Sequence, residues 1–209
     1  AQPGRIFGIT GAVACGKSTL GKAFLCELPY TGSIQYGGRE MAGMTDAERC
    51  GVVGYLGHDP ELLSDSIRNN ILLGRDDDAW KYLRAVCLED EVKAMPNGLD
   101  TRVGDGGVRL SGGQQQRVGV ARALVVEPDI IFADEPTGNL DSHTSEEVLQ
   151  LMQKVVREQH MTLVMVTHDN HLASYADRVF HIIDGKIVKV EDNRELTEAG
   201  GEKETEGKE

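Results

Sequence analysis

The stretch GITGAVACGKSTL, residues 8–20, decides the fold of this 209-residue chain. Residues 11–18 match the pattern G-x-x-x-x-G-K-[ST], in which a glycine-rich loop surrounds phosphate groups with backbone N–H groups. The apolar run RIFGIT precedes this loop, and the segment STLGKAFLCEL that follows has apolar residues at helical spacing. We therefore predict a strand, a phosphate-binding loop and a helix, in that order.

Two side chains at the end of the loop suit a nucleotide with a bound metal ion. Lys17 is expected to reach the β- and γ-phosphates, and the Ser18 hydroxyl is expected to hold Mg²⁺. An ordinary glycine-rich turn is the alternative interpretation, but a lysine directly before a helix argues against it. The predicted nucleotide-binding residues are Gly11, Ala14, Cys15, Gly16, Lys17, Ser18 and Thr19.

A pair of carboxylates follows a second apolar run, DIIFADEP, at residues 129–136. Asp134 and Glu135 are expected at the carboxyl end of a buried strand, where open α/β sheets bind their ligands. Asp134 suits a water-mediated contact with Mg²⁺, and Glu135 suits polarising an attacking water molecule. A strand that ends in an ordinary charged loop is the alternative, and the phosphate-binding pattern in the same chain argues against it.

The remaining periodicity predicts alternating strands and helices at both ends of the chain, interrupted by a helical block. Ser64 is a candidate N-cap for the first helix of that block, and Gly74 is its candidate stop. This order indicates a parallel α/β core with an inserted helical subdomain. We expect strands at 33–36, 51–56, 162–169, 178–184 and 186–190, and helices at 64–74, 76–88, 117–126 and 142–159.

Composition restricts the classes of partner. The formal net charge of −12 argues against a nucleic-acid-binding face, which would need clustered Lys and Arg. Four scattered cysteines indicate neither a zinc site nor a disulfide framework, and they fit a reducing, cytosolic compartment. No apolar run approaches the roughly 18 residues of a membrane span, so we expect the chain to be soluble on its own. The tail at 191–209, with eight acidic and three basic residues, is expected to be disordered.

The segment LSGGQQQR, residues 110–117, resembles the signature sequence of the ABC (ATP-binding cassette) ATPases. The segments GAVACGKST, ADEPTGNLD and VTHD resemble that family's Walker A motif, its Walker B motif with D-loop, and its switch histidine, in the family's order. The resemblance extends from Ile6 to about Val190. It implies an α/β fold with a P-loop NTPase (RecA-like) core, a parallel sheet and an inserted α-helical subdomain.

The resemblance also implies how the chain works. In the family, the signature of one nucleotide-binding domain closes over the ATP held by the Walker A motif of another, and membrane domains choose the transported substrate. Ser111, Gly112, Gly113 and Gln114 would then form the signature contacts with the ATP bound across the interface, and Asp141 of the D-loop would couple the two sites. The implied catalytic residues are Glu135, His168, Lys17 and His58, and the implied metal-binding residues are Ser18, Asp134 and His58.

The resemblance suggests a division of the chain and a subfamily. SDSIRNNILLG and DTRVGDGG resemble the exporter type, whereas DEPTGNLDS is more similar to lipoprotein-releasing and antibiotic-efflux cassettes, and we favour the exporter type. The expected location is the cytoplasmic face of a membrane. The expected segments are 1–62 (first part of the core, with Walker A), 63–126 (helical subdomain, with the signature), 127–190 (second part of the core, with Walker B, D-loop and switch histidine) and 191–209 (tail).

Three positions depart from the family's pattern. His58 stands where most members have Gln, and its protonated ring would repel a metal ion. Ala14 stands where many members have Gly. Few residues precede Gly11, so no upstream aromatic ring is available to stack on adenine, and we expect a chain cut from a longer transporter or a base site completed by another element. A catalytically degenerate, nucleotide-gated regulatory module is the alternative function, and a soluble ABC ATPase acting on nucleic acid is a second rival.

Overall fold

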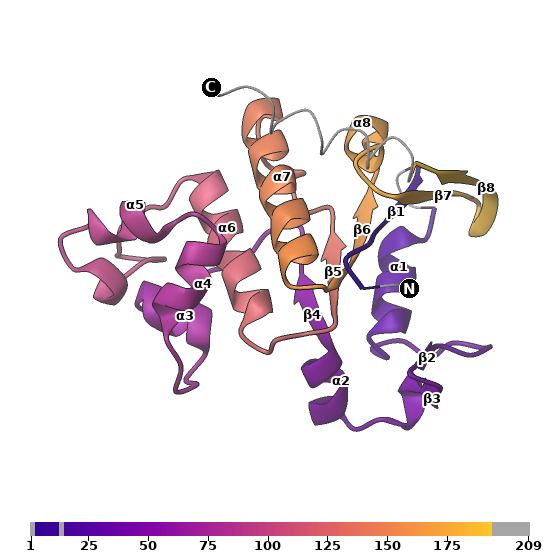
Figure 1. Cartoon of the computed structure of the whole chain (residues 1–209), viewed down its shortest axis with the longest axis horizontal. Helices are drawn as coiled ribbons and strands as arrows, with labels where there is room; N and C mark the ends of the chain where they lie inside the picture. The colour runs from indigo at the N-terminus through magenta and orange to yellow at the C-terminus, as the bar shows by residue number, and fades with distance from the viewer. Residues whose placement is uncertain (1–2, 13–14, 194–209) are drawn as a thin grey trace, which may run out of the picture.

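The molecule is built around a six-stranded sheet (Figure 1), and the computed structural model describes residues 3–12 and 15–193. The strand order is β4-β5-β6-β1-β7-β8; the five strands from β4 to β7 run parallel, and β8 pairs antiparallel with β7. The predicted parallel α/β core is thus confirmed, with one antiparallel edge strand. The strands are β1 (Ile6–Gly11), β4 (Val53–Leu56), β5 (Ile130–Asp134), β6 (Thr162–Thr167), β7 (Arg178–Ile183) and β8 (Lys186–Asp192).

Helices cover both faces of this sheet, because the central strands are apolar on both sides. One face of β5 and β6 presents Phe132 and Val166 to the region of α1 (Lys17–Phe24), while the opposite face packs against α6 (Gly112–Leu124), α7 (Ser142–Glu158) and α8 (Asn170–Ala173). The core therefore has two layers of apolar contact with the sheet between them (Figure 1).

A helical group lies beyond the β4 edge, on the left in Figure 1. It contains α3 (Ile67–Leu72), α4 (Ala79–Ala85), α5 (Glu89–Lys93) and the short 3₁₀ helix η2 (Gly98–Asp100), of which α3 and α4 pack against α6. Asn70 is fully buried, and its backbone oxygen accepts a hydrogen bond from Arg122 Nε of α6 at 2.8 Å. Helix α6 thus belongs to both parts of the molecule, since it also packs against β4.

The amphipathic pattern predicted for residues 142–159 is confirmed. All six apolar residues on the predicted inward face of α7 are buried, and Asp141 caps its N-terminus. Trp80 lies half-buried against the same core. The six buried residues of α7 are Val148, Leu149, Leu151, Met152, Val155 and Val156.

The segment before β4 differs from the expectation of one strand at 51–56. Gly51 and Val52 end helix α2 (Asp46–Val52), and the strand begins only at Val53. The reason is a capping box: the Thr45 hydroxyl accepts the backbone N–H of Glu48, and the Glu48 carboxylate accepts the backbone N–H of Thr45. The expected strand at 33–36 shortens to β2 (Gln35–Tyr36), which pairs with β3 (Arg39–Glu40) before the 3₁₀ helix η1 (Met41–Gly43).

Two predicted helix starts were wrong. Ser66, not Ser64, caps α3 by accepting the backbone N–H of Asn69, whereas the Ser64 hydroxyl accepts the N–H of Asp105. The expected helix at 117–126 begins earlier, at Gly112, because Ser111 is its N-cap.

Three other ends also differ from the expectation. The helix expected at 76–88 is shorter, because Asp78 is its N-cap and its last residue is Ala85. Strand β8 includes residues 191 and 192, the first two of the predicted disordered tail, and residues 194–209 of that tail lie outside the described residues. Among the residues that the structure describes, no helix is long and apolar enough to cross a bilayer.

The buried ring of Phe132 gives a test of this core. It is 1% exposed and stacks on Phe24 at 5.8 Å and on Tyr55 at 6.2 Å between ring centroids. We expect Phe132→Ala to lower the free energy of unfolding in urea by about 3–5 kcal/mol, because it leaves a cavity between the sheet and α1. Tyr55 is 46% exposed, so Tyr55→Ala at the outer end of the stack should cost less than half as much. Equal losses for the two variants would contradict this packing.

Candidate active site

The phosphate-binding loop joins β1 to α1, as the sequence predicts. Gly16 is the N-cap of α1 with φ 99°, a left-handed conformation that side-chain-bearing residues rarely adopt, so glycine is required there. Ala14 lies outside the described residues. Cys15 is half-buried at the base of the loop, and its Sγ lies 3.9 Å from Lys17 Nζ.

Lys17 points back into its own loop. The residue is 4% exposed, and Nζ donates to the carbonyl oxygens of Gly11 at 2.8 Å and Ala12 at 2.9 Å. These two carbonyl dipoles compensate the buried positive charge. The ammonium group is therefore held at the carboxyl end of β1, beside the first turn of α1.

The second half of the predicted site lies next to this loop. Ser18 Oγ donates to Asp134 Oδ1 at 3.3 Å, although the two residues are 116 positions apart in the chain. Only β6 separates β1 from β5 in the sheet, so their carboxyl ends lie close together. Burial and, next, the negative charge of Asp134 raise the pKa of Tyr55, which lies beside this end of β5.

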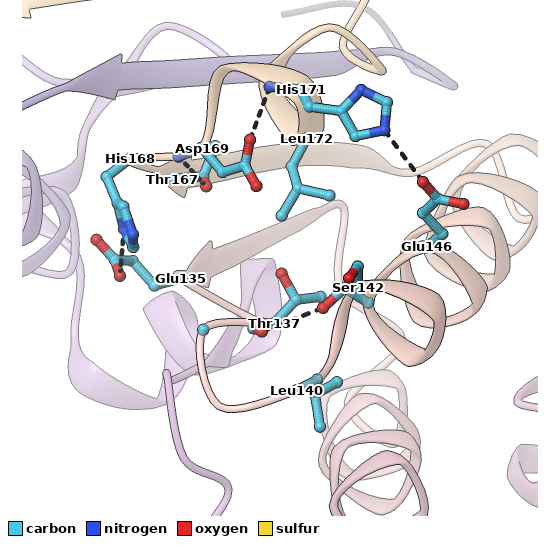
Figure 2. A pocket seen from close by; sticks show the side chains of 12 residues that line it. Glu135, Thr137, Leu140, Ser142, Glu146, Thr167, His168, Asp169, His171 and Leu172 are labelled. Carbon is cyan, nitrogen blue, oxygen red and sulfur yellow. Dashed lines mark hydrogen bonds and ion pairs between the residues drawn. The ribbon is translucent and has the colours of Figure 1, made fainter.

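Glu135 and His168 face each other across the same edge of the sheet (Figure 2). Their atoms Oε2 and Nδ1 are 2.9 Å apart, and since an ionised carboxylate only accepts hydrogen bonds, Nδ1 carries the proton. Glu135 has φ 48°, an uncommon backbone conformation outside glycine, and its N–H continues the sheet by donating to the Val166 oxygen. The strained backbone directs the carboxylate toward the loop that follows β6.

His58 reaches the same place from the end of β4. Its Nδ1 lies 3.2 Å from the backbone oxygen of Glu135, so Nδ1 donates and Nε2 is left as the acceptor in the neutral ring. Gly138 lies against this ring, and a Cβ at that position would overlap it. The structure thus brings together His58, Glu135 and His168 from three different strands.

A cleft of about 270 Å³ opens beside the Glu135–His168 pair, between α7 and α8 (Figure 2). Asp169 caps α8 by accepting the backbone N–H of His171, and His171 Nε2 pairs with Glu146 of α7 at 3.1 Å. The cleft therefore connects the carboxylate pair with the first turns of both helices. It is lined by Glu135, Thr137, Gly138, Leu140, Ser142, Ser145, Glu146, Thr167, His168, Asp169, His171 and Leu172.

The predicted signature forms the first turn of α6. The Ser111 hydroxyl accepts the backbone N–H of Gln114 at 3.2 Å, and the Gln114 side-chain oxygen accepts the backbone N–H of Ser111 at 2.9 Å. Gly112 and Gly113 lie against the side chains of Leu140 and Thr144 at the start of α7. This turn is thus positioned by the same chain's D-loop segment.

Asp141 has a structural contact of its own. Its carboxylate accepts the Thr144 backbone N–H at 3.1 Å and the Thr144 hydroxyl at 2.7 Å, and these hydrogen bonds lower the pKa of Asp141. The residue therefore caps α7 within its own chain.

Comparison with known proteins identifies this arrangement. Residues 1–138 match the family described as ABC transporter. The chain belongs to the ABC transporter family. It is 36% identical over 199 residues to an uncharacterized ABC transporter ATP-binding protein of Methanocaldococcus jannaschii, and that match covers 90% of this chain and 86% of the relative.

Longer relatives in the ABC family carry the same unit as part of a larger chain. The macrolide export ATP-binding/permease protein MacB of Agrobacterium fabrum is 39% identical over 203 residues, a match that covers 92% of this chain and 30% of that protein. A bacterial Atm1-family ABC exporter with ATP bound has the same fold, with a TM-score of 0.79 and 29% identity over 94% of this chain and 35% of the exporter chain. The chain spans between 15% and 29% of the length of five further curated relatives.

The family resemblance drawn from the motifs is therefore confirmed, as is the α/β, P-loop ATPase fold. The chain is the ATP-binding component of an ABC transporter and an ATPase that energises transport. The predicted ligand residues of this ABC domain fall into two groups in the structure. Lys17, Ser18, Asp134 and Glu135 lie with His168 at one edge of the sheet, whereas Ser111 contacts Gln114 at the start of α6.

Two features of this ABC domain were not anticipated from the sequence. Glu91 of α5 accepts a hydrogen bond from Gln114 Nε2 at 2.7 Å, and Gly138 accommodates the ring of His58. The spacing of 23 residues between Glu91 and Gln114 matches no local pattern, so no signal in the sequence pointed to that pair. Gly138 stands in the D-loop segment DEPTGNLDS, but its contact with the end of β4 depends on the sheet order.

Proposed function

We propose that this chain hydrolyses Mg-ATP in a site completed by a second nucleotide-binding domain, and that it thereby powers export of a substrate chosen by membrane domains. The observation that carries the proposal is the convergence of Ser18, Asp134 and Glu135 with His168 at the carboxyl ends of β1, β5 and β6. The exporter relatives support export, although a lipoprotein-releasing system protein is also similar to this chain.

Ser18 and Asp134 would hold Mg²⁺. One hydroxyl and one carboxylate, 3.3 Å apart at the sheet edge, are the hard oxygen donors that this ion uses together with substrate phosphates and water. Among the described residues, no group of three His, Cys, Asp or Glu gathers that could hold a metal ion unaided, which fits a site that relies on the nucleotide's own oxygens. When bound, the ion would neutralise charge on the phosphate oxygens.

Lys17 would bind the terminal phosphates of ATP. Its ammonium group is already bonded to the loop carbonyls of Gly11 and Ala12, so it is held by the loop that would surround the phosphates. Phosphate oxygens would accept hydrogen bonds from Nζ and from the N–H groups of Cys15, Gly16, Ser18 and Thr19. Catalysis would then depend mainly on positioning and charge stabilisation.

Glu135 and His168 would handle the attacking water. Glu135 Oε2 accepts from His168, while Oε1 has no hydrogen-bond partner among the residues that the structure describes, so Oε1 is available to accept from water. The water oxygen would attack the γ-phosphorus as the bond between that phosphorus and the oxygen retained by ADP breaks. His168, in its protonated form, would donate from Nε2 to a γ-phosphate oxygen while Nδ1 holds Glu135 in place.

The signature would act on the ATP of a second copy or a sister domain. The side chains of Ser111 and Gln114 form hydrogen bonds at the start of α6 and with Glu91 of α5. Among the described residues, neither side chain is bonded to the phosphate-binding loop. Ser111 and Gly113 stand at the N-terminus of a 13-residue helix, whose dipole favours anionic oxygen. We propose that this turn meets the γ-phosphate held by the partner in a head-to-tail dimer, and that Asp141 couples the two sites.

Membrane domains would dock beside the end of β4. A groove of about 390 Å³ lies beside the segment that follows His58, and its lining includes Asp59, Glu61, Leu62, Asp105, Val108 and Arg109. The resemblance of residues 100–107 to the exporter segment that touches membrane domains supports this assignment, which would place the chain at the cytoplasmic face of a membrane. We also propose that segments 1–62 and 127–190 form the nucleotide-binding core and that 63–126 forms the helical subdomain, with the end of the core moved from 190 to Asp192, where β8 ends.

Replacement of the proposed water-binding carboxylate tests the reaction. We expect Glu135→Gln to reduce Mg-ATP hydrolysis by at least about 100-fold, the scale on which a positioned general base acts, while ATP affinity changes little. Phosphate release and binding of a fluorescent ATP analogue measure the two quantities. Glu146→Gln, at the far end of the same cleft, is the matched control and should keep near-normal hydrolysis. If wild-type chain binds ATP without hydrolysing it under any condition, the regulatory-module alternative is favoured.

His58 should slow turnover relative to glutamine. The ring presents Nε2 as an acceptor for a water molecule on the metal, whereas a glutamine side chain offers a carbonyl oxygen to the metal itself. We expect His58→Gln to hydrolyse Mg-ATP faster than the wild type and to reach its half-maximal rate at a lower Mg²⁺ concentration. Both chains keep His168, so the difference isolates position 58. Equal rates with an equal dependence on Mg²⁺ would contradict this role.

A further inference from the structure

Glu91 of α5 bonds to two side chains of the signature segment, 110–117. Its carboxylate divides between two residues of α6: Oε2 accepts from Gln114 Nε2 at 2.7 Å, and Oε1 pairs with Arg117 Nη1 at 2.9 Å. The Arg117 side chain is 24% exposed and the Glu91 side chain 40% exposed. The pair is thus partly shielded from solvent, where charged hydrogen bonds are stronger than at a fully open surface.

The Gln114 side chain bridges Glu91 and the start of α6. Its oxygen accepts the backbone N–H of Ser111, and its NH₂ group donates to Glu91. A carboxylate accepts only, so Glu91 favours the one orientation of the Gln114 amide that leaves the oxygen pointing to Ser111. Without Glu91, the Gln114 amide can rotate, and the capping box then loses the hydrogen bond from the Ser111 backbone N–H to the Gln114 oxygen.

Arg117 makes a second bridge between the same two helices. Besides pairing with Glu91, it donates to the backbone oxygen of Cys87 at 3.0 Å and to that of Gly113 at 3.4 Å. The start of α6 is therefore joined to α5 by two contacts of Glu91, and to the connection between α4 and α5 by one contact, at Cys87. These bonds hold Ser111 and Gly113 in one geometry.

We propose that Glu91 is a positioning residue for the composite ATP site: by holding Gln114, it orders Ser111 and Gly113 for the nucleotide carried by a second domain. This inference rests on the proposed head-to-tail function. Holding the turn in advance lowers the conformational entropy lost when the partner's ATP is bound. Arg117 compensates the negative charge of Glu91, so the carboxylate can act beside an anion site without repelling the phosphate.

The stability of the ATP-bound dimer tests this role. In a Glu135→Gln parent, in which hydrolysis is slow, sedimentation at saturating Mg-ATP gives the dissociation constant of the dimer. We expect Glu91→Ala to raise that constant about tenfold, the scale of losing a hydrogen bond to a charged group. Glu91→Gln should raise it less than about threefold, because its amide oxygen still accepts from Gln114. ATP binding to the single chain, measured below the concentration at which dimers form, should stay within about twofold.

Glu89→Ala is the matched control on the same helix. Glu89 pairs with Arg84 and Lys93, which lie within the helical group, so its removal disturbs α5 without touching α6. It should leave the dimer unchanged. In a Gln114→Ala background, Glu91→Ala should have little further effect, because Glu91 acts through Gln114.

Several outcomes would overturn the inference. An unchanged dimer in Glu91→Ala, an equal loss in Glu89→Ala, or an equal loss of ATP affinity in the single chain would each show that Glu91 does not position the signature. If the Glu135→Gln parent binds ATP but stays monomeric, the composite site itself is wrong, and that result is visible in the parent alone.

Discussion

The parallel pairing of β5, β6 and β1 is the constraint on which the site depends. The register places Asp134 opposite Val166 and Thr10 opposite Thr167, so all three strands end at the same level. The chain segments that leave them carry the phosphate-binding loop, the carboxylate pair and His168. The three segments are far apart in sequence. The hydrogen bond from Ser18 to Asp134 and the pairing of Glu135 with His168 therefore form only when the three strands pair in this register.

The signature turn, at the start of α6, lies away from that edge. Helix α6 packs against both the sheet and the helical group. Leu140 of the D-loop segment contacts its first turn from one side, and Glu91 of α5 bonds to it from the other. Within one chain, the phosphate-binding loop and the signature turn, both suited to bind phosphate, are therefore held by different elements. Such a separation gives a physical reason for two chains to share each ATP, since either feature alone would contact only part of the nucleotide.

Much of the site could be predicted from sequence because its residues occur in short motifs. Lys17 and Ser18 follow a glycine loop, and Asp134 and Glu135 follow a buried strand, so local patterns sufficed to place them at the ends of strands. Helix α2 was missed because the apolar run GVVGYL suggested a strand, whereas the capping box of Thr45 and Glu48 starts a helix just before it. The pairing of Glu91 with Gln114 could not be predicted, because it depends on how α5 packs on α6 and not on any local spacing.

The rate of Mg-ATP hydrolysis per chain, measured against chain concentration, tests the central claim that each site is shared. The account predicts that the rate per chain rises with concentration and then reaches a plateau, as single chains become dimers. A rate per chain that is the same at every concentration, down to dilutions at which sedimentation finds only monomers, would contradict it. One chain would then contain a complete catalytic site, and the signature would have another purpose.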